Sequence, residues 1–248
     1  MIPEIAAHRS VRKYKPDSIP EAVLREVLEA GARASNTGNM QLYSMVVTRS
    51  AALREKLSPL HFAQPMVRQA PALITFCADV NRFSLWCRLR GAEPAYDNFL
   101  WFVNAMTDAV LASQNVALEA EAHGLGICYL GTAVYNAAAI AEVLRLPQGV
   151  IPVAAMCLGY PDGQAPMTDR LPLEAVVHWE QYEDYTPGRL EALWAEKEGS
   201  EQTRQLLEAN DLPNLARIFT DKRYPKGDNL AFSRAYFEAL QRQGFFNQ

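Results

Sequence analysis

The segment from Phe99 to Ala122 constrains the fold more than any other part of this 248-residue chain. It has the length of a long helix and is nearly apolar on all sides. A helix with so little polar face usually lies at the centre of a core or at an interface. Its polar residues, among them Asn104, Asp108 and Glu119, would be costly in lipid, which argues against a membrane span. We therefore expect a central helix of a soluble protein.

The rest of the chain mixes helical and strand patterns without a strict alternation. Ser18–Glu21 has the spacing of a capping box, and apolar residues at helical spacing then predict a helix to about residue 34. Apolar runs predict strands at 42–47, 72–78, 127–130 and 151–158, and further patterns predict helices at 136–146, 188–210 and 231–241 with a loop at 224–228. This pattern favours one α+β domain over residues 1–248, in which 188–248 is a C-terminal extension that docks on a partner.

Composition excludes several classes of protein. A net charge of −4 and a pI near 5.7 argue against a general nucleic-acid binder, which needs clustered cations. The four histidines lack metal-ligand spacing, so no metal is expected. The four cysteines lie in or beside apolar stretches and are expected to be reduced core thiols. The N-terminus has no signal-peptide pattern, and a cytoplasmic location is the expectation.

Four separate segments carry groups suited to a flat, phosphorylated heterocycle. Residues 8–12 place two arginines around a serine, and guanidinium groups match phosphate geometry. Residues 35–41 offer amide side chains around Gly38, and residues 124–132 place glycines about a strand without a complete dinucleotide fingerprint. Arg170 lies in a later loop. Taken alone, these segments read more simply as a solvated basic face, a polar turn, tight packing and a solvated arginine.

No reactive side chain stands out in the sequence. It contains neither a Gly-x-Ser-x-Gly nucleophile elbow nor a Walker loop, and no paired carboxylates suggest an acid and a base. The chain supplies binding groups, which is the pattern expected where a cofactor carries the chemistry.

Together, the segments resemble the FMN-dependent nitroreductase family, and most closely its oxygen-insensitive NADPH nitroreductase and flavin reductase branch. The opening His8–Tyr14 and the polar loop ending in Gln41 are similar to the first blocks of that branch. Residues 64–71, 157–161, 170–172 and 243–245 resemble its later blocks in the same order. Each motif is loose, but their ordered spacing is specific and covers nearly the whole chain.

The resemblance implies FMN as cofactor, NADPH or NADH as co-substrate, and no catalytic side chain. The residues implied in FMN binding are His8, Arg9, Ser10, Arg12, Asn36, Gly38, Asn39, Gln64, Leu130, Gly131, Thr132 and Arg170. Residues 8–12 would hold the phosphate, the ribityl chain and the flavin edge. Residues 36–39 and Gln64 would contact the ring and its polar rim. Residues 130–132 would lie beside the ring, and Arg170 would reach the phosphate. Two departures stand out: Thr132 replaces a frequent glycine, and Thr168 stands where lysine is common, which predicts a weaker phosphate grip. The segment 188–228 matches poorly, which leaves the choice between NADPH and NADH open.

The resemblance also implies a nitroreductase-like fold, with a central mixed, mainly antiparallel sheet flanked by helices. It implies a homodimer whose C-terminal extensions wrap the partner, and a ping-pong transfer of hydride from NAD(P)H through FMN to nitroaromatics, quinones or similar flat acceptors. Two uses of the same scaffold, as a flavin reductase or a reductive dehalogenase, are alternatives. A further alternative is a non-catalytic FMN-binding module.

Overall fold

The computed structural model describes residues 1–247 and divides the chain into two compact units. Unit 1 comprises Met1–Pro166 and Phe232–Gln248, and unit 2 comprises Met167–Ala231. This division begins at residue 167, not at 188, and the last helix continues from unit 2 into unit 1. A single domain that includes both units remains a proposal.

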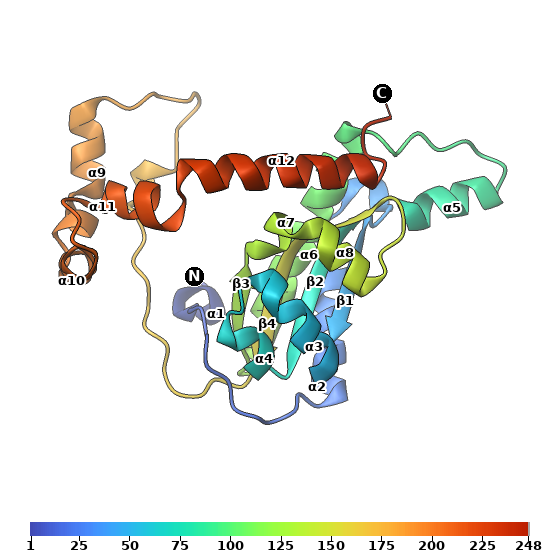
Figure 1. Ribbon diagram of the computed structural model, residues 1–248, viewed down its shortest axis with the longest axis horizontal. Helices are drawn as coiled ribbons and strands as arrows, with labels where there is room; N and C mark the ends of the chain where they lie inside the picture. The colour runs from blue at the N-terminus through green and yellow to red at the C-terminus, as the bar shows by residue number, and fades with distance from the viewer. Residues whose placement is uncertain (248) are drawn as a thin grey trace. The chain divides into compact units, whose positions relative to one another are not determined.

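The strands of unit 1 form one four-stranded sheet (Figure 1). They are β1 (Tyr43–Thr48), β2 (Ala72–Asp79), β3 (Gly126–Leu130) and β4 (Val150–Gly159), in the order β1-β2-β4-β3. All three pairings are antiparallel. Beyond the edge strand β3, a parallel bridge joins Ser10 to Ile127, and the Val11 amide donates to the Ile127 carbonyl at 2.8 Å. The α+β class and the mainly antiparallel sheet are therefore confirmed.

Helices surround this sheet. In unit 1 they are α1 (Pro3–Ala7), α2 (Glu21–Ala32), η1 (Thr37–Asn39), α3 (Ala51–Leu57), η2 (Ser58–His61), α4 (Pro65–Gln69), α5 (Asn81–Leu89), α6 (Phe99–Ala122), α7 (Thr132–Tyr135) and α8 (Ala137–Leu144). Unit 2 holds η3 (Leu173–Ala175), α9 (Pro187–Gly199), α10 (Glu201–Asn210), α11 (Leu215–Arg217) and η4 (Ile218–Arg223). The last helix, α12 (Lys226–Arg242), begins in unit 2 and ends in unit 1. None of the helices within residues 1–247 combines the length and the apolar character needed to cross a membrane.

The two faces of the sheet bury different cores because neighbouring strand residues point to opposite sides. On β4, Met156 packs with α2 and α6, whereas its neighbour Cys157 packs with α3, α4, α7 and α8. Figure 1 shows these helices in front of and behind the sheet. A third cluster joins the first turn of α6 to the segment that follows α12, through buried Phe102 and Phe245. The sheet is thus covered on both faces.

Helix α6 is the central helix that the sequence predicts. Its buried face is built mainly from alanines, and Gly31 of α2 lies against it so closely that a Cβ at Gly31 would approach Val116 Cγ2 to 2.6 Å. Small side chains on both helices permit this approach. The Asn98 side chain caps the helix by accepting from the Trp101 amide at 3.3 Å.

Asp108 on α6 fixes the polar loop that follows α2. This side chain is 1% exposed. One carboxyl oxygen accepts from the Thr37 amide at 2.8 Å and from the Thr37 hydroxyl at 3.0 Å, and the other accepts from the Leu42 amide at 3.1 Å. The loop therefore takes its position from a residue some seventy positions away in the chain.

Several predicted helix boundaries are wrong. Ser18 does not cap α2, which begins after Pro20, because the preceding Ile19 is buried in the core and the backbone at Pro20 is extended. The expected helix 188–210 breaks at Ser200, whose hydroxyl accepts from the Thr203 amide and caps α10. The expected loop 224–228 already contains the start of α12.

We predict that Asp108→Ala lowers the free energy of unfolding by roughly 3 kcal/mol, because it removes three hydrogen bonds and leaves two backbone amides without partners. Urea denaturation measures this loss. Thr107→Ala, an exposed neighbour on the same helix, is the matched control and should change stability by less than about 0.5 kcal/mol. Equal stabilities of the two variants would contradict the anchoring role of Asp108.

Candidate functional site

Two turns from distant parts of the chain are joined by a buried polar contact. The His61 Nδ1 atom lies 2.7 Å from the Thr132 hydroxyl. The Gln64 side-chain amide donates to the His61 carbonyl at 3.1 Å, and the Asn136 amide donates to the Leu60 carbonyl at 2.7 Å. Gln64 and Thr132, predicted from separate motifs, are thus brought together. His61 was not predicted, although it makes the contact between them.

His61 is fully buried, and this determines its charge. Burial lowers the pKa of His61 to about 4, so the imidazole is neutral near pH 7. Its Nε2 atom is also buried and has no hydrogen-bond partner within the described residues. A buried polar atom without a partner is costly unless a ligand or water satisfies it.

Gly131 leaves open space beside this contact. A Cβ built at Gly131 would meet no atom within 4 Å, and the residue is exposed. The preceding Leu130 is 2% exposed and packs into the core below. A planar ligand could therefore lie against the backbone at 130–131 while the leucine side chain supports the strand.

Arg12 lies beside strand β3. Burial raises the pKa of the Cys128 thiol, and the nearby Arg12 guanidinium partly offsets that rise. Ser10 is held next to the same strand by its bridge to Ile127. Ser10 is therefore paired with β3, and Arg12 lies near Cys128 of the same strand, which ends at Leu130 beside Gly131 and Thr132.

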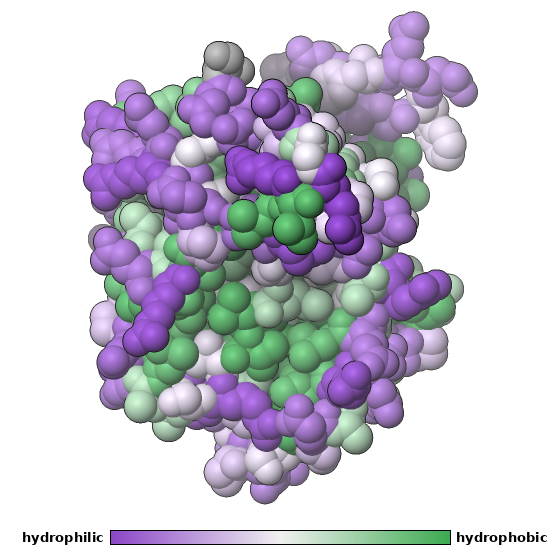
Figure 2. Space-filling view, turned by 90° about the vertical axis from the view of Figure 1, so that its right-hand side faces the viewer, coloured by the Kyte–Doolittle hydropathy of each residue, from purple (hydrophilic) through white to green (hydrophobic). Residues whose placement is uncertain are grey.

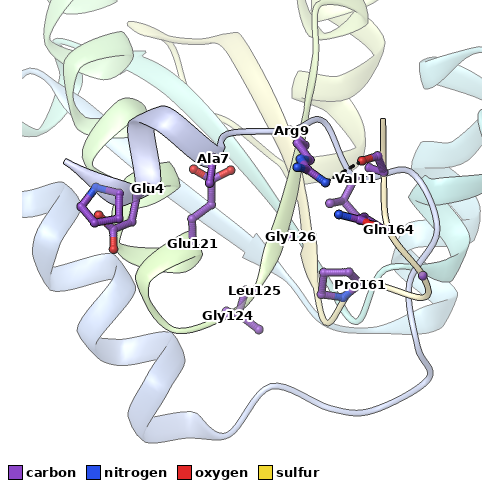
Figure 3. A pocket seen from close by; sticks show the side chains of 13 residues that line it. Glu4, Ala7, Arg9, Val11, Glu121, Gly124, Leu125, Gly126, Pro161 and Gln164 are labelled. Atoms are coloured by element: carbon purple, nitrogen blue, oxygen red, sulfur yellow. Dashed lines mark hydrogen bonds between the residues drawn. The ribbon is translucent and has the colours of Figure 1, made fainter. Parts of the chain in front are cut away.

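Arg9 lines a cavity of about 340 Å³ at the other end of β3 (Figure 3), and His8 reaches its wall through Glu121. Arg9 donates from Nη1 to the Ala165 carbonyl at 3.2 Å, while its buried Nε has no partner among the described residues. His8 Nδ1 lies 2.7 Å from a carboxyl oxygen of Glu121, which also lines the cavity. Burial raises the pKa of Glu121, and His8 acts against that rise. Arg9 contributes to the cavity wall, whereas Arg12 lies outside its lining.

The loop 36–41 uses its polar groups largely on itself. The Asn36 side chain accepts from the Gln41 amide at 3.1 Å and donates to the Ala34 carbonyl at 3.3 Å. Gly38 and Asn39 adopt left-handed backbone with φ values of 54° and 56°. Asn36 thus closes the loop that Asp108 anchors, and Gly38 permits its turn.

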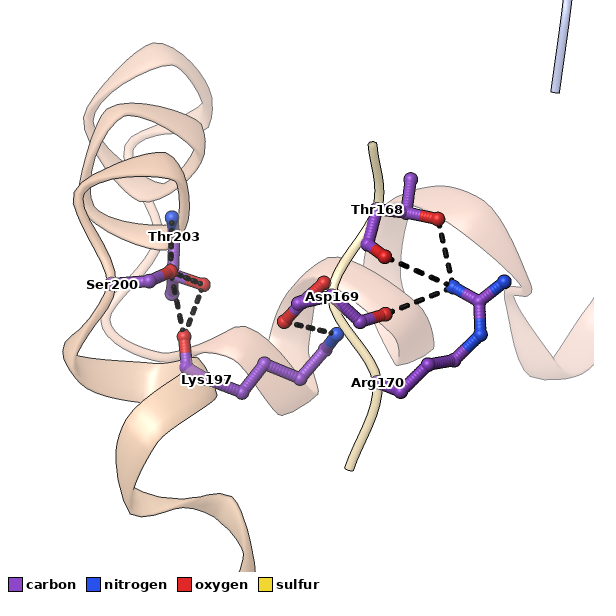
Figure 4. Close-up of polar contacts among 6 residues, drawn as sticks. All are labelled: Thr168, Asp169, Arg170, Lys197, Ser200 and Thr203. Carbon is purple, nitrogen blue, oxygen red and sulfur yellow. Dashed lines mark hydrogen bonds and ion pairs between the residues drawn. The ribbon is translucent and has the colours of Figure 1, made fainter. Parts of the chain in front are cut away.

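Arg170 lies in unit 2 within a network of polar contacts (Figure 4). Its Nη1 donates to the Thr168 hydroxyl at 2.8 Å, the Thr168 carbonyl at 3.3 Å and the Asp169 carbonyl at 3.0 Å. Lys197 of α9 forms an ion pair with Asp169 at 2.8 Å. Thr168, expected to weaken a phosphate grip, therefore orients Arg170, and Lys197 brings a second cation to the same loop. No local pattern in the sequence signalled Lys197.

A sequence model described as the Nitroreductase family matches residues 5–160, more than half of the chain. The chain belongs to the nitroreductase family. This confirms the family that the ordered motifs predicted.

Two curated relatives of this nitroreductase cover similar shares of the chain. An oxygen-insensitive NADPH nitroreductase of Salmonella typhimurium is 34% identical over 72% of this chain and 73% of its own length. An FMN reductase (NADPH) of Bacillus subtilis is 30% identical over 73% of this chain and 74% of its own length.

Solved structures share the fold over nearly the whole chain. A crystal structure from Bacteroides fragilis has a TM-score of 0.97 at 43% identity and covers 99% of this chain and 100% of its own. The NADPH:FMN oxidoreductase of Vibrio harveyi complexed with NAD+ has a TM-score of 0.82 at 26% identity, with coverage of 98% and 97%.

We predict that acid destabilises the protein through His61. Its pKa in the folded state, about 4, lies below the usual 6.5, so the unfolded chain binds more protons between these values. The free energy of unfolding should therefore fall as the pH drops from about 6.5 to 4, by on the order of 3 kcal/mol. His61→Asn, which keeps a donor near Thr132 but does not titrate, should flatten this dependence in urea unfolding at several pH values. Parallel curves for the two proteins would exclude His61 as the cause.

Proposed function

We propose that this nitroreductase is a cytoplasmic, FMN-dependent oxidoreductase that moves hydride from NAD(P)H to nitroaromatics, quinones or similar flat acceptors. When bound, FMN supplies the redox chemistry by accepting hydride from the nicotinamide and passing it to the acceptor, in ping-pong order. The protein binds and orients these molecules. No side chain is assigned as a general acid or base.

The observation that carries this proposal is the convergence of Gln64, His61 and Thr132 beside the open backbone at Gly131. The amide of Gln64 and the open backbone at Gly131 are suited to the mixed donor and acceptor edge of a flavin ring, and the buried His61–Thr132 contact holds their two turns together. The residues therefore fit FMN. The names of the Bacillus subtilis FMN reductase and the Vibrio harveyi NADPH:FMN oxidoreductase support the same cofactor and co-substrate.

The flanking cations have distinct proposed roles. Arg12 places positive charge at the flavin edge, and a hydrogen bond from such a group contributes roughly 1.5–3 kcal/mol. Ser10 donates to the ribityl chain, and Arg170, oriented by Thr168, binds the phosphate. The remaining residues proposed to contact FMN or shape its site are His8, Arg9, Asn36, Gly38, Asn39 and Leu130.

Free flavin is a second candidate acceptor. The 30% identical Bacillus subtilis relative is named an FMN reductase, and a site open enough for one flat ring to stack can accept another. Comparing FMN with a nitroaromatic as the varied acceptor separates the two candidates.

A homodimer is part of the proposal. In unit 1, apolar side chains are exposed on α5 and α6, and Figure 2 shows apolar surface gathered on one face. The large apolar residues exposed on these helices are Leu85, Trp86, Leu89, Phe99, Leu100, Val110 and Leu111. Apolar groups exposed along a central helix are typical of an interface with another chain. We propose that a second copy covers α6 and that the C-terminal extension wraps it.

We predict that the protein sediments as a dimer and that Leu111→Glu shifts it to monomer, because a carboxylate would be buried without a partner. Leu111 is 43% exposed. Leu173→Glu is the control, since Leu173 is exposed but lies in η3, outside both α6 and the extension 188–248. If the Leu111→Glu variant still sediments as a dimer, this face of α6 is not part of the interface.

We predict that the purified protein binds FMN, is yellow, and bleaches when NADPH or NADH is added. Arg12→Ala should weaken FMN binding at least tenfold in an absorbance titration, because the edge of the flavin ring loses its neighbouring cation. Lys13→Ala, an exposed neighbouring cation, is the control and should bind normally.

Each failure of this test has a defined meaning. Failure to bind FMN at all would refute the enzyme proposal. FMN binding without bleaching by either nicotinamide would favour the non-catalytic FMN-binding module.

A further inference from the structure

Three aromatic rings from separate segments pack together beside the His61–Thr132 contact. Tyr135 of α7 stacks on Phe232 of α12, with ring centroids 4.6 Å apart and planes inclined by 13°. Phe62 lies 6.1 Å from Tyr135 and 5.8 Å from Phe232. All three residues belong to unit 1. We call these three rings the aromatic wall.

The backbone that carries Phe62 is in an unfavourable conformation. Phe62 and Ala63 both adopt left-handed backbone, with φ values of 56° and 52°. Bulky residues rarely adopt this region, which glycine enters freely. The turn is held by the Ala63 amide, which donates to the Ser58 carbonyl at 2.8 Å, and by the Phe62 amide, which donates to the Pro59 carbonyl at 3.1 Å. Such outliers persist where the surrounding structure enforces them, and they cluster at functional sites.

The strained turn does not serve to bury the Phe62 ring. Phe62 is 52% exposed, and Tyr135 and Phe232 are only partly buried. Their packing therefore presents aromatic surface to solvent instead of filling the core. An exposed ring held in an unfavourable backbone conformation points to a ligand.

The aromatic wall adjoins the proposed flavin site along the chain. Phe62 directly follows His61, and Tyr135 lies three residues after Thr132 on the short helix α7. Because His61 and Thr132 are in hydrogen-bond contact, Phe62 and Tyr135 come from the two turns beside the open space at Gly131, and Phe232 of α12 packs on both rings.

We propose that Phe62, Tyr135 and Phe232 form a stacking surface for the electron acceptor and select planar, electron-poor aromatic molecules over compact, non-planar ones. This inference rests on the proposed function. The faces of phenyl and phenol rings are electron-rich, so they attract an electron-poor ring in offset stacking. Nitroaromatics and quinones are such molecules, whereas an octahedral anion such as ferricyanide is not.

The test replaces Phe62 by glycine in the FMN-loaded protein. Glycine suits the left-handed backbone, so Phe62→Gly should keep or raise the melting temperature while it removes the ring. The KM for 4-nitrobenzoate should rise about tenfold, and the KM for ferricyanide should stay unchanged. Calorimetric titration of 4-nitrobenzoate into the oxidised, FMN-loaded protein without nicotinamide measures the affinity of the parent and of the Phe62→Gly variant independently of turnover.

A second variant and a matched control complete the experiment. Phe232→Leu should weaken 4-nitrobenzoate binding in the same direction, because it removes the ring stacked on Tyr135 while keeping apolar bulk. Phe237→Ala should change neither binding nor either KM, since Phe237 is exposed on the same helix and packs on Phe246 outside the aromatic wall.

The outcomes separate this inference from the proposed function. Unchanged nitrobenzoate affinity in both wall variants, with FMN bound and ferricyanide reduced as in the parent, would overturn the aromatic wall and leave the oxidoreductase intact. A lower melting temperature without a change in affinity would assign the rings a structural role only. Failure of the parent protein to bind FMN would instead overturn the proposed function.

Discussion

Burial of the sheet on both faces is the constraint on which the rest of unit 1 depends. Strands β2 and β4 send alternate side chains into two separate cores, so helices must cover both sides. α6 meets this need on one side with a face of alanines that lets α2 approach closely. Since both faces are filled, a ligand can approach the sheet at its strand ends and edges, and Ser10, Leu130 and Gly131 lie there.

Buried polar contacts then fix the loops at those strand ends. Asp108 holds the loop 37–42 through three hydrogen bonds, and His61 joins its own turn to that of Thr132. Each contact spans about seventy residues of chain, and each is protected from water. Buried hydrogen bonds of this kind define one loop conformation, because breaking them leaves polar atoms unsatisfied. A preorganised loop is what a protein needs when it must orient a cofactor.

The absence of an obvious reactive side chain from the sequence has a chemical meaning in this family. A flavin carries the redox step, so the protein contributes position, charge and selectivity. The neutral histidine, the amide of Gln64 and the cation at Arg12 serve the first two purposes in our proposal. The aromatic wall would serve the third, and the strained backbone at Phe62 shows that keeping a ring there has a cost in stability.

The sequence alone determined the α+β class, the central helix and all four strands, because hydrophobic periodicity is a local property. It also identified the family from the order of its motifs, and it named Gln64 and Thr132 as site residues. Helix ends were less predictable: Ser18 has capping spacing but does not cap, since burial of Ile19 decides where α2 begins. The contact between Gln64, His61 and Thr132, and the packing of Phe62, Tyr135 and Phe232, arise only when the sheet brings distant turns together. His61 carried no signal in the sequence, because a histidine becomes a neutral buried link only through the tertiary structure that removes it from water.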